Sequence, residues 1–519
     1  MKKIKSITGS ATSVTIAVFI SRILGLVREQ VLAYFFGATN SMDAFVVAYR
    51  IPNLLRDLFA EGALSSAFVK VFSSSLEVHG EERGFQIARE LMSNFLIILI
   101  GVVLLGMVFS GDIVSLIAPH FKQNPEKFLL TVRLTRIMMP FLLLISLSSI
   151  LAGILNTYKV FFLPAFSSAL FNLTFIFVGA SGYYLLRHLG IPPIYAMALG
   201  VLIGGIVQFL FQCPLVKKIG FKFAFTPNFK SKEFKEVITL ILPVIFGLSV
   251  VQVNIFINTY FATSCGKGAV SWYAYAFRIM YVPLGLFGIG LSQALLPELS
   301  RQIARKDYSL AKEIFSRALV ISLSVSIPSA IGLFVLAKPV IAVLFERGKF
   351  TYFDTLITSD ILKILSLGLP FYGLTKTVVP LFYSLGKTTI PALGSVVAVI
   401  TNIFVIILTI KHLGIKGVAL GTATSLMLQN LFLLAIAFFK LSPPEPKFFF
   451  RSLFTLTVAS LALFLVLEGV KSFFTSSALI VILGLPLGAG TFLLICRILG
   501  PSETYMFFER LIAKFSRRG

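Results

Sequence analysis

Ionised side chains that could bind an anion lie inside two long apolar stretches near the start of the chain. Residues 21–63 carry, among others, Arg22, Arg28, Asp43, Arg50, Arg56, Asp57 and Glu61. Each such charge at the bilayer centre costs about 2.5–3.5 kcal/mol on insertion scales, so together they cannot face lipid. Guanidinium groups bind phosphate through planar, paired hydrogen bonds. The pattern predicts a polar, arginine-bearing cavity inside a membrane protein and an anionic, phosphorylated substrate.

Helical geometry decides whether the first two arginines can meet. In an expected span over residues 10–36, Arg22 and Arg28 lie on either side of Gly25. Their guanidinium groups would be about 120° apart on a straight helix. A bend at Gly25 would bring both towards one cavity.

A second expected span, over residues 41–73, repeats its charges at a helical interval. Asp43, Arg50 and Asp57 recur every seventh residue and share nearly one face. Pro52 is expected to interrupt this helix because it has no N–H, and a broken helix is tolerated where freed carbonyls meet water or ligand. Three polar residues follow the break as a candidate rim: Asn53, Arg56 and Glu61.

A further arginine stands in a later span. The segment AVSWYAYAFRIMYVPLGLFG places Arg278 among aromatic residues, which is unfavourable unless its side chain reaches the same cavity. A repeat, described below, predicts that Arg278 faces Arg22, Arg28 and Arg56.

Ion pairing within the membrane is the alternative explanation for these charges, for example Asp43 with Arg28 or Glu61 with Arg56. Some pairing is expected. Carboxylates are fewer than guanidinium groups in these spans, however, so the sequence predicts that positive charge remains for a substrate.

Composition sets the fold class. The chain has 519 residues, of which 57% are hydrophobic and 13% charged, and its mean hydropathy is +0.93. These values indicate an all-α polytopic membrane protein, and continuous apolar runs exclude a β-barrel. The net charge of +24 is attributed to Lys and Arg on cytoplasmic loops, with no nucleic-acid partner expected.

Apolar runs of spanning length number about fourteen. They cover residues 10–36, 41–73, 91–110, 131–156, 163–187, 193–214, 236–262, 268–298, 316–345, 356–384, 388–410, 415–439, 450–470 and 476–498. Basic residues concentrate before the first run, in the even-numbered connections and in the tail, which predicts that both termini are cytoplasmic.

Two weak self-similarities suggest a parallel repeat of about 230 residues. Residues 139–172 resemble 369–402, and residues 64–75 resemble 291–302. We therefore predict two six-helix lobes around a central cavity. The predicted divisions are an N-terminal lobe at 1–215, a C-terminal lobe at 216–440, two additional helices at 441–499 and a basic amphipathic cytoplasmic tail at 500–519.

No enzyme signature accompanies these features. The chain lacks G-x-x-x-x-G-K-[ST], so no ATP-hydrolysing motor is expected within it. Three scattered cysteines give neither a disulfide framework nor metal-ligand spacing. No cofactor is predicted, and the residues do not identify a coupling ion.

Several segments resemble the MurJ/MviN family. They are SRILGLVRE, the GAT-x₃-DAF pattern of 37–45, IPNLLRDLFAEGALSSAFV at 51–69, VSWYAYAFRIMYVPLGLFG and FERGKF at 345–350. The resemblance covers essentially the whole chain, and residues 51–69 are its most specific part. The chain is therefore similar to the lipid II flippases, which belong to the multidrug/oligosaccharidyl-lipid/polysaccharide exporter superfamily.

The resemblance implies an activity and a location. It implies a multi-pass protein of the bacterial cytoplasmic (inner) membrane that flips lipid II, the undecaprenyl-diphosphate-linked peptidoglycan precursor, by alternating access, for cell wall biogenesis and cell shape. The final two helices would form a groove for the lipid tail. Partners implied are lipid II, the phospholipid bilayer and other proteins of cell-wall synthesis.

The resemblance also implies functional residues, each present here as the family's residue type: Arg22, Arg28, Asp43, Arg56 and Arg278. Neighbouring cavity or portal positions correspond to Ser21, Arg50, Asn53 and Glu61. Phe277 stands where some members have an acidic residue, which removes one partner for Arg278.

Competing functions remain open from the residues alone. One is another transporter of the superfamily, such as a polysaccharide-lipid flippase or a drug/cation antiporter, although an antiporter for organic cations predicts a carboxylate-dominated cavity. Others are a membrane enzyme acting on polyprenyl phosphates, which would need acid/base or metal residues at one interface, and a structural scaffold.

Overall fold

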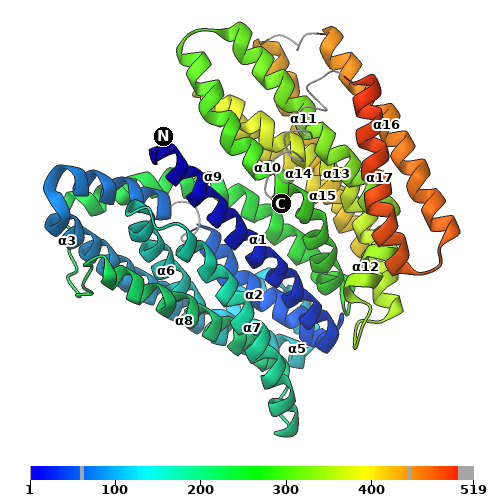
Figure 1. Cartoon of the computed structure of the whole chain (residues 1–519). Helices are drawn as coiled ribbons and strands as arrows, with labels where there is room; N and C mark the ends of the chain where they lie inside the picture. The colour runs from blue at the N-terminus through cyan, green and yellow to red at the C-terminus, as the bar shows by residue number, and fades with distance from the viewer. Residues whose placement is uncertain (1, 59–63, 442–445, 501–519) are drawn as a thin grey trace. The chain divides into compact units, whose positions relative to one another are not determined.

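The computed structural model is all-helical over the residues that it describes, which are 2–58, 64–441 and 446–500 (Figure 1). An all-α class was predicted from composition and is confirmed. The chain forms two compact units, Met1–Ser271 and Trp272–Gly519. Each is described by itself below.

The first unit holds α1 to α9 and two short 3₁₀ turns. Their bounds are α1 Lys2–Phe36, α2 Asn40–Leu58, α3 Leu64–Val108, α4 Ser110–Ile117, η2 Pro119–Gln123, α5 Pro125–Met138, α6 Pro140–Thr157, α7 Phe162–His188, α8 Ile194–Lys218, α9 Lys232–Ala262 and η3 Thr263–Cys265.

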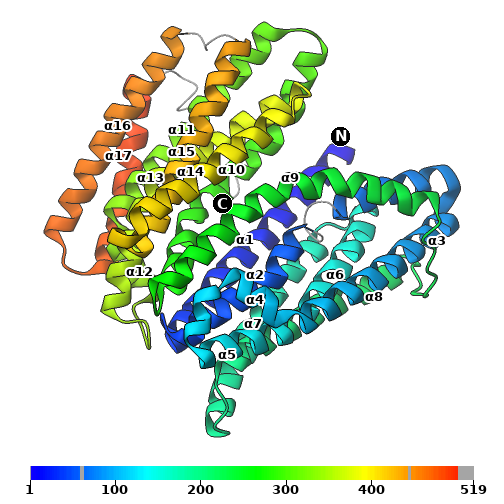
Figure 2. The same ribbon diagram turned by 180° about the vertical axis from the view of Figure 1, so that it is seen from behind.

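Small residues let the helices of this unit approach closely. α7 and α8 run side by side, and α1 packs on α7 (Figures 1 and 2). A Cβ added at Gly200 or Gly204 of α8 would lie 3.1 Å from the carbonyl oxygen of Phe175 or Phe171 on α7. Close backbone contact through glycine is the usual packing of membrane helices, because lipid provides no hydrophobic force between them.

The second unit begins within α10 and continues to α17. The bounds are α10 Ala269–Ala304, α11 Tyr308–Val335, α12 Ala337–Phe345, α13 Tyr352–Ser384, α14 Thr389–Leu413, α15 Ile415–Leu441, α16 Pro446–Phe473 and α17 Ser477–Leu499. α14 packs along α15 in the same way, since a Cβ at Gly421 would lie 3.1 Å from the carbonyl oxygen of Asn402. α16 packs along α17.

Within the described residues, ten helices are long and apolar enough to cross a membrane. α10 becomes an eleventh if its two halves, Ala269–Gly285 and Gly290–Ala304, count as one span bent by 47°. α1, α2 and α9 correspond to three further predicted spans but are not among these. The prediction of fourteen spans therefore remains a prediction.

The predicted span at 41–73 is wrong in its extent. The structure describes α2 as far as Leu58 and α3 from Leu64, and α3 continues past the expected end at residue 73 to Val108. Gly80 interrupts α3 with a φ of 79°, a left-handed value that glycine adopts without steric cost. Hydropathy placed the end of the span at residue 73 because the residues that follow, 74–83, are mostly polar or charged.

The predicted break at Pro52 is also wrong. α2 continues as a helix through Pro52. An interior proline removes one hydrogen bond and crowds the preceding turn, and packing of α2 against α5 and α9 can offset that cost.

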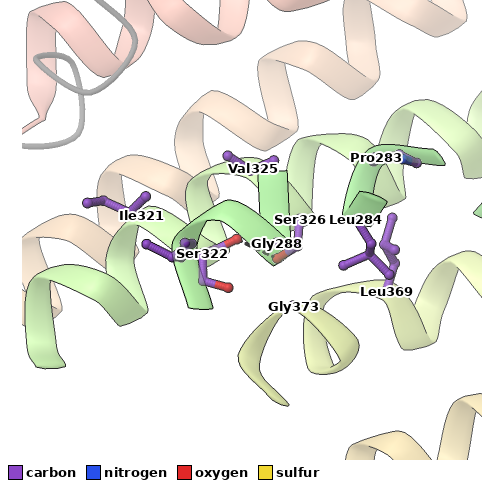
Figure 3. Close-up of a pocket in the computed structure, with 10 residues that line it drawn as sticks. Pro283, Leu284, Gly288, Ile321, Ser322, Val325, Ser326, Leu369 and Gly373 are labelled. Atoms are coloured by element: carbon purple, nitrogen blue, oxygen red, sulfur yellow. Dashed lines mark hydrogen bonds between the residues drawn. The ribbon is translucent and has the colours of Figure 1, made fainter. Parts of the chain in front are cut away.

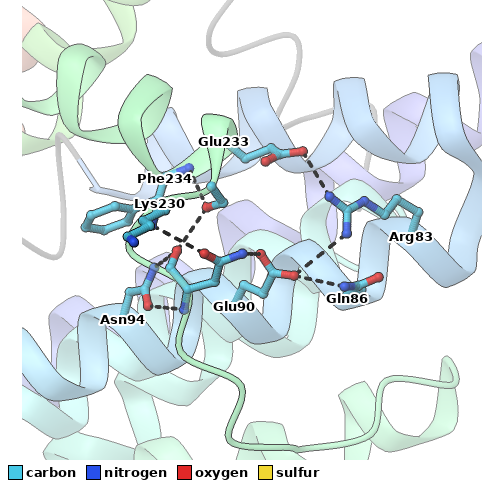
Figure 4. Close-up of polar contacts among 9 residues, drawn as sticks. Arg83, Gln86, Glu90, Asn94, Lys230, Glu233 and Phe234 are labelled. Atoms are coloured by element: carbon cyan, nitrogen blue, oxygen red, sulfur yellow. Dashed lines mark hydrogen bonds and ion pairs between the residues drawn. The ribbon is translucent and has the colours of Figure 1, made fainter.

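The linker between α8 and α9 is bound to α3 by buried polar groups (Figure 4). Asn94 of α3 donates to the Asn228 carbonyl at 2.9 Å and accepts from the Asn228 N–H at 2.8 Å. Arg83 of α3 forms ion pairs with Glu90 at 3.7 Å and with Glu233 of α9 at 3.5 Å. This network groups α9 with the first unit.

Contact therefore divides the chain after Ser271, whereas the predicted repeat divides it at 215/216. The predicted repeat is a similarity between two halves of the sequence, whereas the two units are defined by contacts between residues. The units therefore do not test the predicted lobes or the two-helix groove, which stay predictions. Residues 501–519 of the predicted amphipathic tail lie outside the described residues.

Candidate functional site

Asp43 is the centre of a closed polar cluster in the first unit. Its side chain is fully buried and pairs with Lys127 of α5, the Nζ–Oδ2 distance being 2.8 Å. It also accepts from the N–H of Gly268 at 2.8 Å, and from the N–H and hydroxyl of Ser271 at 3.0 and 2.6 Å. Lys127 lies 4.1 Å from the ring centre of Phe121.

These contacts assign Asp43 a structural position. A carboxylate accepts about four hydrogen bonds, and Asp43 already has four donors around it. It holds α2 to α5 and to the first turn of α10. The predicted pairing with Arg28 is wrong, because Lys127 takes that place.

Arg28 lies in a second, partly open cluster. Its side chain is 18% exposed and its Nη2 contacts Glu29 Oε1 at 3.0 Å. Its Nη1 donates to Asn172 Oδ1 of α7 at 3.1 Å. Asn172 also donates to the Ser21 carbonyl at 3.1 Å. One amide therefore connects two of the predicted site residues, Ser21 and Arg28, which share a face of α1.

Aromatic rings and a second arginine surround Arg28. Its guanidinium carbon lies 5.6 Å from the ring centre of Phe175 and 6.0 Å from that of Phe171. The charge of Arg56 and the hydroxyl of Tyr49 are both within its electrostatic reach. Two predicted arginines, Arg28 and Arg56, are thus brought into one neighbourhood by α1 and α2.

Arg56 pairs with its sequence neighbour Asp57, with an Nη2–Oδ1 distance of 3.0 Å and side-chain exposures of 22% and 29%. Asp57 also accepts from Gln252 of α9 at 3.3 Å. Arg50 lies seven residues before Asp57 on α2, and it donates to the Thr259 hydroxyl and to the Ile255 carbonyl of α9. Arg50 and the Asp57 partner of Arg56 therefore both contact α9.

The remaining predicted residues of this unit differ in exposure. Arg22 is exposed on α1, whereas Arg28 is half-buried, as expected for two positions about 120° apart. α1 is one helix through Gly25. Asn53 is half-buried on α2. Glu61 lies outside the described residues, so its predicted pairing with Arg56 stays untested.

Arg278 belongs to the second unit. It is half-buried on α10, in a segment where Phe277 stacks on Tyr273 and is tilted against Tyr281. Tyr281 shares a hydrogen bond of 3.0 Å with Tyr372 of α13, and Lys376 lies 5.5 Å from the Tyr372 ring centre. The prediction that Arg278 faces the arginines of α1 and α2 stays a prediction.

A small cavity of the same unit lies between α10, α11 and α13 (Figure 3). Its volume is about 30 Å³, and its lining includes Pro283, Leu284, Leu369 and two serines but no charged residue. A cavity of this size and chemistry does not accept a diphosphate.

Sequence reasoning missed the partners that fix these side chains: Glu29, Asn172, Lys127, Thr259 and Gln252. Glu29 was available, since it follows Arg28 directly in SRILGLVRE. The other four are separated by 84 to 209 residues from their partners. Among the described residues no group of three His, Cys, Asp or Glu could hold a metal ion.

Comparison with known proteins places the chain in a family. The family model described as "Lipid II flippase MurJ" matches residues 32–484.

This chain belongs to the lipid II flippase MurJ family.

Relatives within the MurJ family share a third of its residues over most of the chain. A probable lipid II flippase MurJ of Buchnera aphidicola is 37% identical over 394 residues, covering 75% of this chain and 76% of its own. A lipid II flippase MurJ of Burkholderia cenocepacia is 34% identical over 439 residues, covering 83% and 84%.

Solved structures agree in fold. A lipid II flippase MurJ in an inward closed conformation has a TM-score of 0.78 and 30% identity, covering 96% of this chain and 99% of its own. An inward-facing multidrug resistance transporter of the MATE family has a TM-score of 0.70 at 15% identity, covering 83% and 98%. The second likeness shows a shared fold.

Proposed function

We propose that this chain is a transporter, not an enzyme, that moves lipid II from the inner to the outer leaflet of the bacterial cytoplasmic membrane by alternating access. Family membership over residues 32–484 is the observation that carries the proposal. The likeness to a MurJ structure over 96% of the chain supports it. The shared fold of MATE transporters fits alternating access.

The diphosphate head group would be bound by arginines. Arg28 and Arg56 lie in one neighbourhood and remain 18% and 22% exposed, so their guanidinium groups are accessible although each has a carboxylate partner. Arg22 is exposed and adds a further positive charge on α1. Ser21, Arg50, Asn53, Glu61 and Arg278 complete the proposed substrate-binding set. Asp43 would act by holding helices in place.

The energy for outward movement can come from the membrane potential. An inside-negative potential favours outward transfer of an anion by about 2.3 kcal/mol per charge for each 100 mV. No cofactor is proposed, and a coupling ion is not assigned. The polyprenyl chain would stay in lipid, along α16 and α17.

The orientation and partners follow from the same proposal. Both termini would be cytoplasmic, because basic residues concentrate in the connections on their side. Lipid II and the surrounding phospholipids are the proposed partners, together with other proteins of cell-wall synthesis.

Complementation of a flippase-depleted bacterium tests this function, with lipid II on the outer surface measured directly. Arg22→Ala, Arg28→Ala and Arg278→Ala should each abolish exposure of lipid II while the protein still inserts. Arg187→Ala is the matched control, because Arg187 is an exposed arginine at the end of α7, outside the proposed set. Normal lipid II exposure in all three variants would refute the proposal.

A further inference from the structure

A surface groove lies at the end of α8, away from the proposed substrate residues. Its walls are Phe209, Leu210, Cys213 and Pro214 of α8, with Phe223 of the linker opposite them and Lys217 as the single charged residue in the lining. The groove is largely open on one side, and its volume is about 540 Å³. The groove is therefore apolar, with one lysine side chain in its lining.

The depth of this groove in the membrane follows from α8. The exposed side chains Leu199, Ile206 and Leu210 follow one side of the helix at intervals of seven and four residues. About twenty helical residues cross the hydrocarbon core. Because α8 starts at Ile194, the apolar walls lie at the edge of the acyl chains, and Lys217 lies among head groups.

Basic residues are concentrated at the end of α8 and in the linker that follows it. Lys217, Lys218 and Lys222 are all exposed. The sequence contains no Asp or Glu between Glu126 and Glu233, and the lining residues include none. A ligand with a net negative head is therefore favoured over a zwitterionic one, since each lysine near the membrane surface attracts anionic lipid.

The wall contributed by the linker is already fixed. Phe221 is buried and lies edge-on to Phe85 of α3 and to Phe223, with ring centres 5.8 and 5.3 Å apart. Further along, the Thr226 N–H donates to Ser93 of α3 at 3.0 Å, just before the polar network of Figure 4. Binding therefore need not order the linker, which reduces its entropic cost.

We infer that this groove binds an anionic phospholipid of the adjoining leaflet. One acyl chain lies along Leu210 and Pro214 and against Phe223, and the phosphate lies beside Lys217, with Lys218 and Lys222 in the same head-group layer. The lipid would anchor the linker between α8 and α9 to the membrane surface. The inference rests on α8 spanning the membrane and is independent of what the protein transports.

Native mass spectrometry of the full-length protein, titrated with phosphatidylglycerol or with phosphatidylcholine of equal chain length, tests the site. The unmodified protein should retain phosphatidylglycerol in preference to phosphatidylcholine. The triple variant Lys217→Gln/Lys218→Gln/Lys222→Gln should bind phosphatidylglycerol about tenfold or more weakly. Glycerol phosphate without acyl chains should not compete.

A matched triple variant separates the site from net charge. Lys230→Gln/Lys232→Gln/Lys235→Gln removes three exposed lysines of the same region and should leave the affinity within about twofold, since charges beyond a Debye length are screened. A phosphatidylglycerol carrying a diazirine on its acyl chain should crosslink to the peptide that contains residues 209–217.

Three results would overturn the inference: equal loss of binding in both triple variants, equal affinity for the two phospholipids, or crosslinks confined to other peptides. Leu210→Trp gives a second test at constant charge. It should fill the groove and weaken phosphatidylglycerol binding, and unchanged binding would also contradict the site.

Discussion

Two ion-pair clusters of the first unit contain charges that look alike in the sequence and differ in the fold. The Asp43–Lys127 pair is sealed from solvent, with exposures of 0% and 7%. The pairs of Arg28 and Arg56 are partly exposed and use carboxylates adjacent in sequence. The first cluster is built to hold helices, whereas the arginine side chains of the second remain partly exposed.

Breaking the closed pair should have the largest effect on stability. Asp43→Ala leaves Lys127 buried without its carboxylate, and loss of one partner of a buried pair costs about 3–5 kcal/mol. We expect a large fall in thermal stability in detergent and poor yield. A double variant, Asp43→Leu/Lys127→Met, should recover part of the loss, because no charge then remains buried. Equal stability of Asp43→Ala and the unmodified protein would contradict a structural role.

In the open cluster, changing the shape of a cation should affect transport more than stability. Arg28→Lys keeps the charge but cannot contact Glu29 and Asn172 together, because an ammonium lacks the planar fork. We expect lipid II flipping in proteoliposomes to fall by about tenfold or more, with a shift in melting temperature of a few degrees. If the variant melts at a much lower temperature yet flips lipid II at the normal rate, Arg28 stabilises the fold and does not bind substrate.

Asn172→Ala should have a smaller effect. It removes the amide that connects Ser21 and Arg28, each hydrogen bond being worth about 1 kcal/mol net. We expect flipping to fall several-fold, with the lipid II concentration for half-maximal flipping raised. Asn172→Gln would test whether a longer amide restores the link, and full activity of Asn172→Ala would show that Arg28 needs no positioning.

Arg83→Ala, on the outer face of α3, should have the smallest effect. Its pairs with Glu90 and Glu233 are 3.7 and 3.5 Å long and its side chain is 41% exposed, so about 0–1 kcal/mol is at stake. The free energy of unfolding should change by no more than this amount, and the rate of lipid II flipping should stay close to that of the unmodified protein. A severe loss in either would mean that the linker contacts of Figure 4 do more than fix the linker.

The sequence predicted the helices better than the contacts between them. Predicted spans such as 163–187 and 415–439 agree within a few residues with α7 and α15, because each is an uninterrupted apolar run between turns. The continuation of α3 past residue 73 was missed because residues 74–83 are mostly polar or charged. A proline at position 52 did not break α2, since packing overrode a local preference.

The ionised residues inside the spans could be identified from the sequence, but their hydrogen-bond and ion-pair partners could not. The cost of ionised groups in a membrane predicted that Arg28 and Asp43 line a wet cavity or form ion pairs, and in the structure both form ion pairs. The hydrogen-bond and ion-pair partners of each residue come from helices that are distant in the sequence. Lys127 is 84 residues from Asp43 and Asn172 is 144 from Arg28, so periodicity within a single span carries no signal for either contact.

Arg22 offers the most direct test of substrate binding by arginine, because its exposed side chain can be removed with little effect on packing. The measurement is the flipping rate of lipid II in proteoliposomes for Arg22→Ala beside Arg187→Ala, with melting temperatures taken on the same preparations. We predict unchanged melting for both and loss of flipping in Arg22→Ala alone. Equal flipping rates in the two variants would contradict the account.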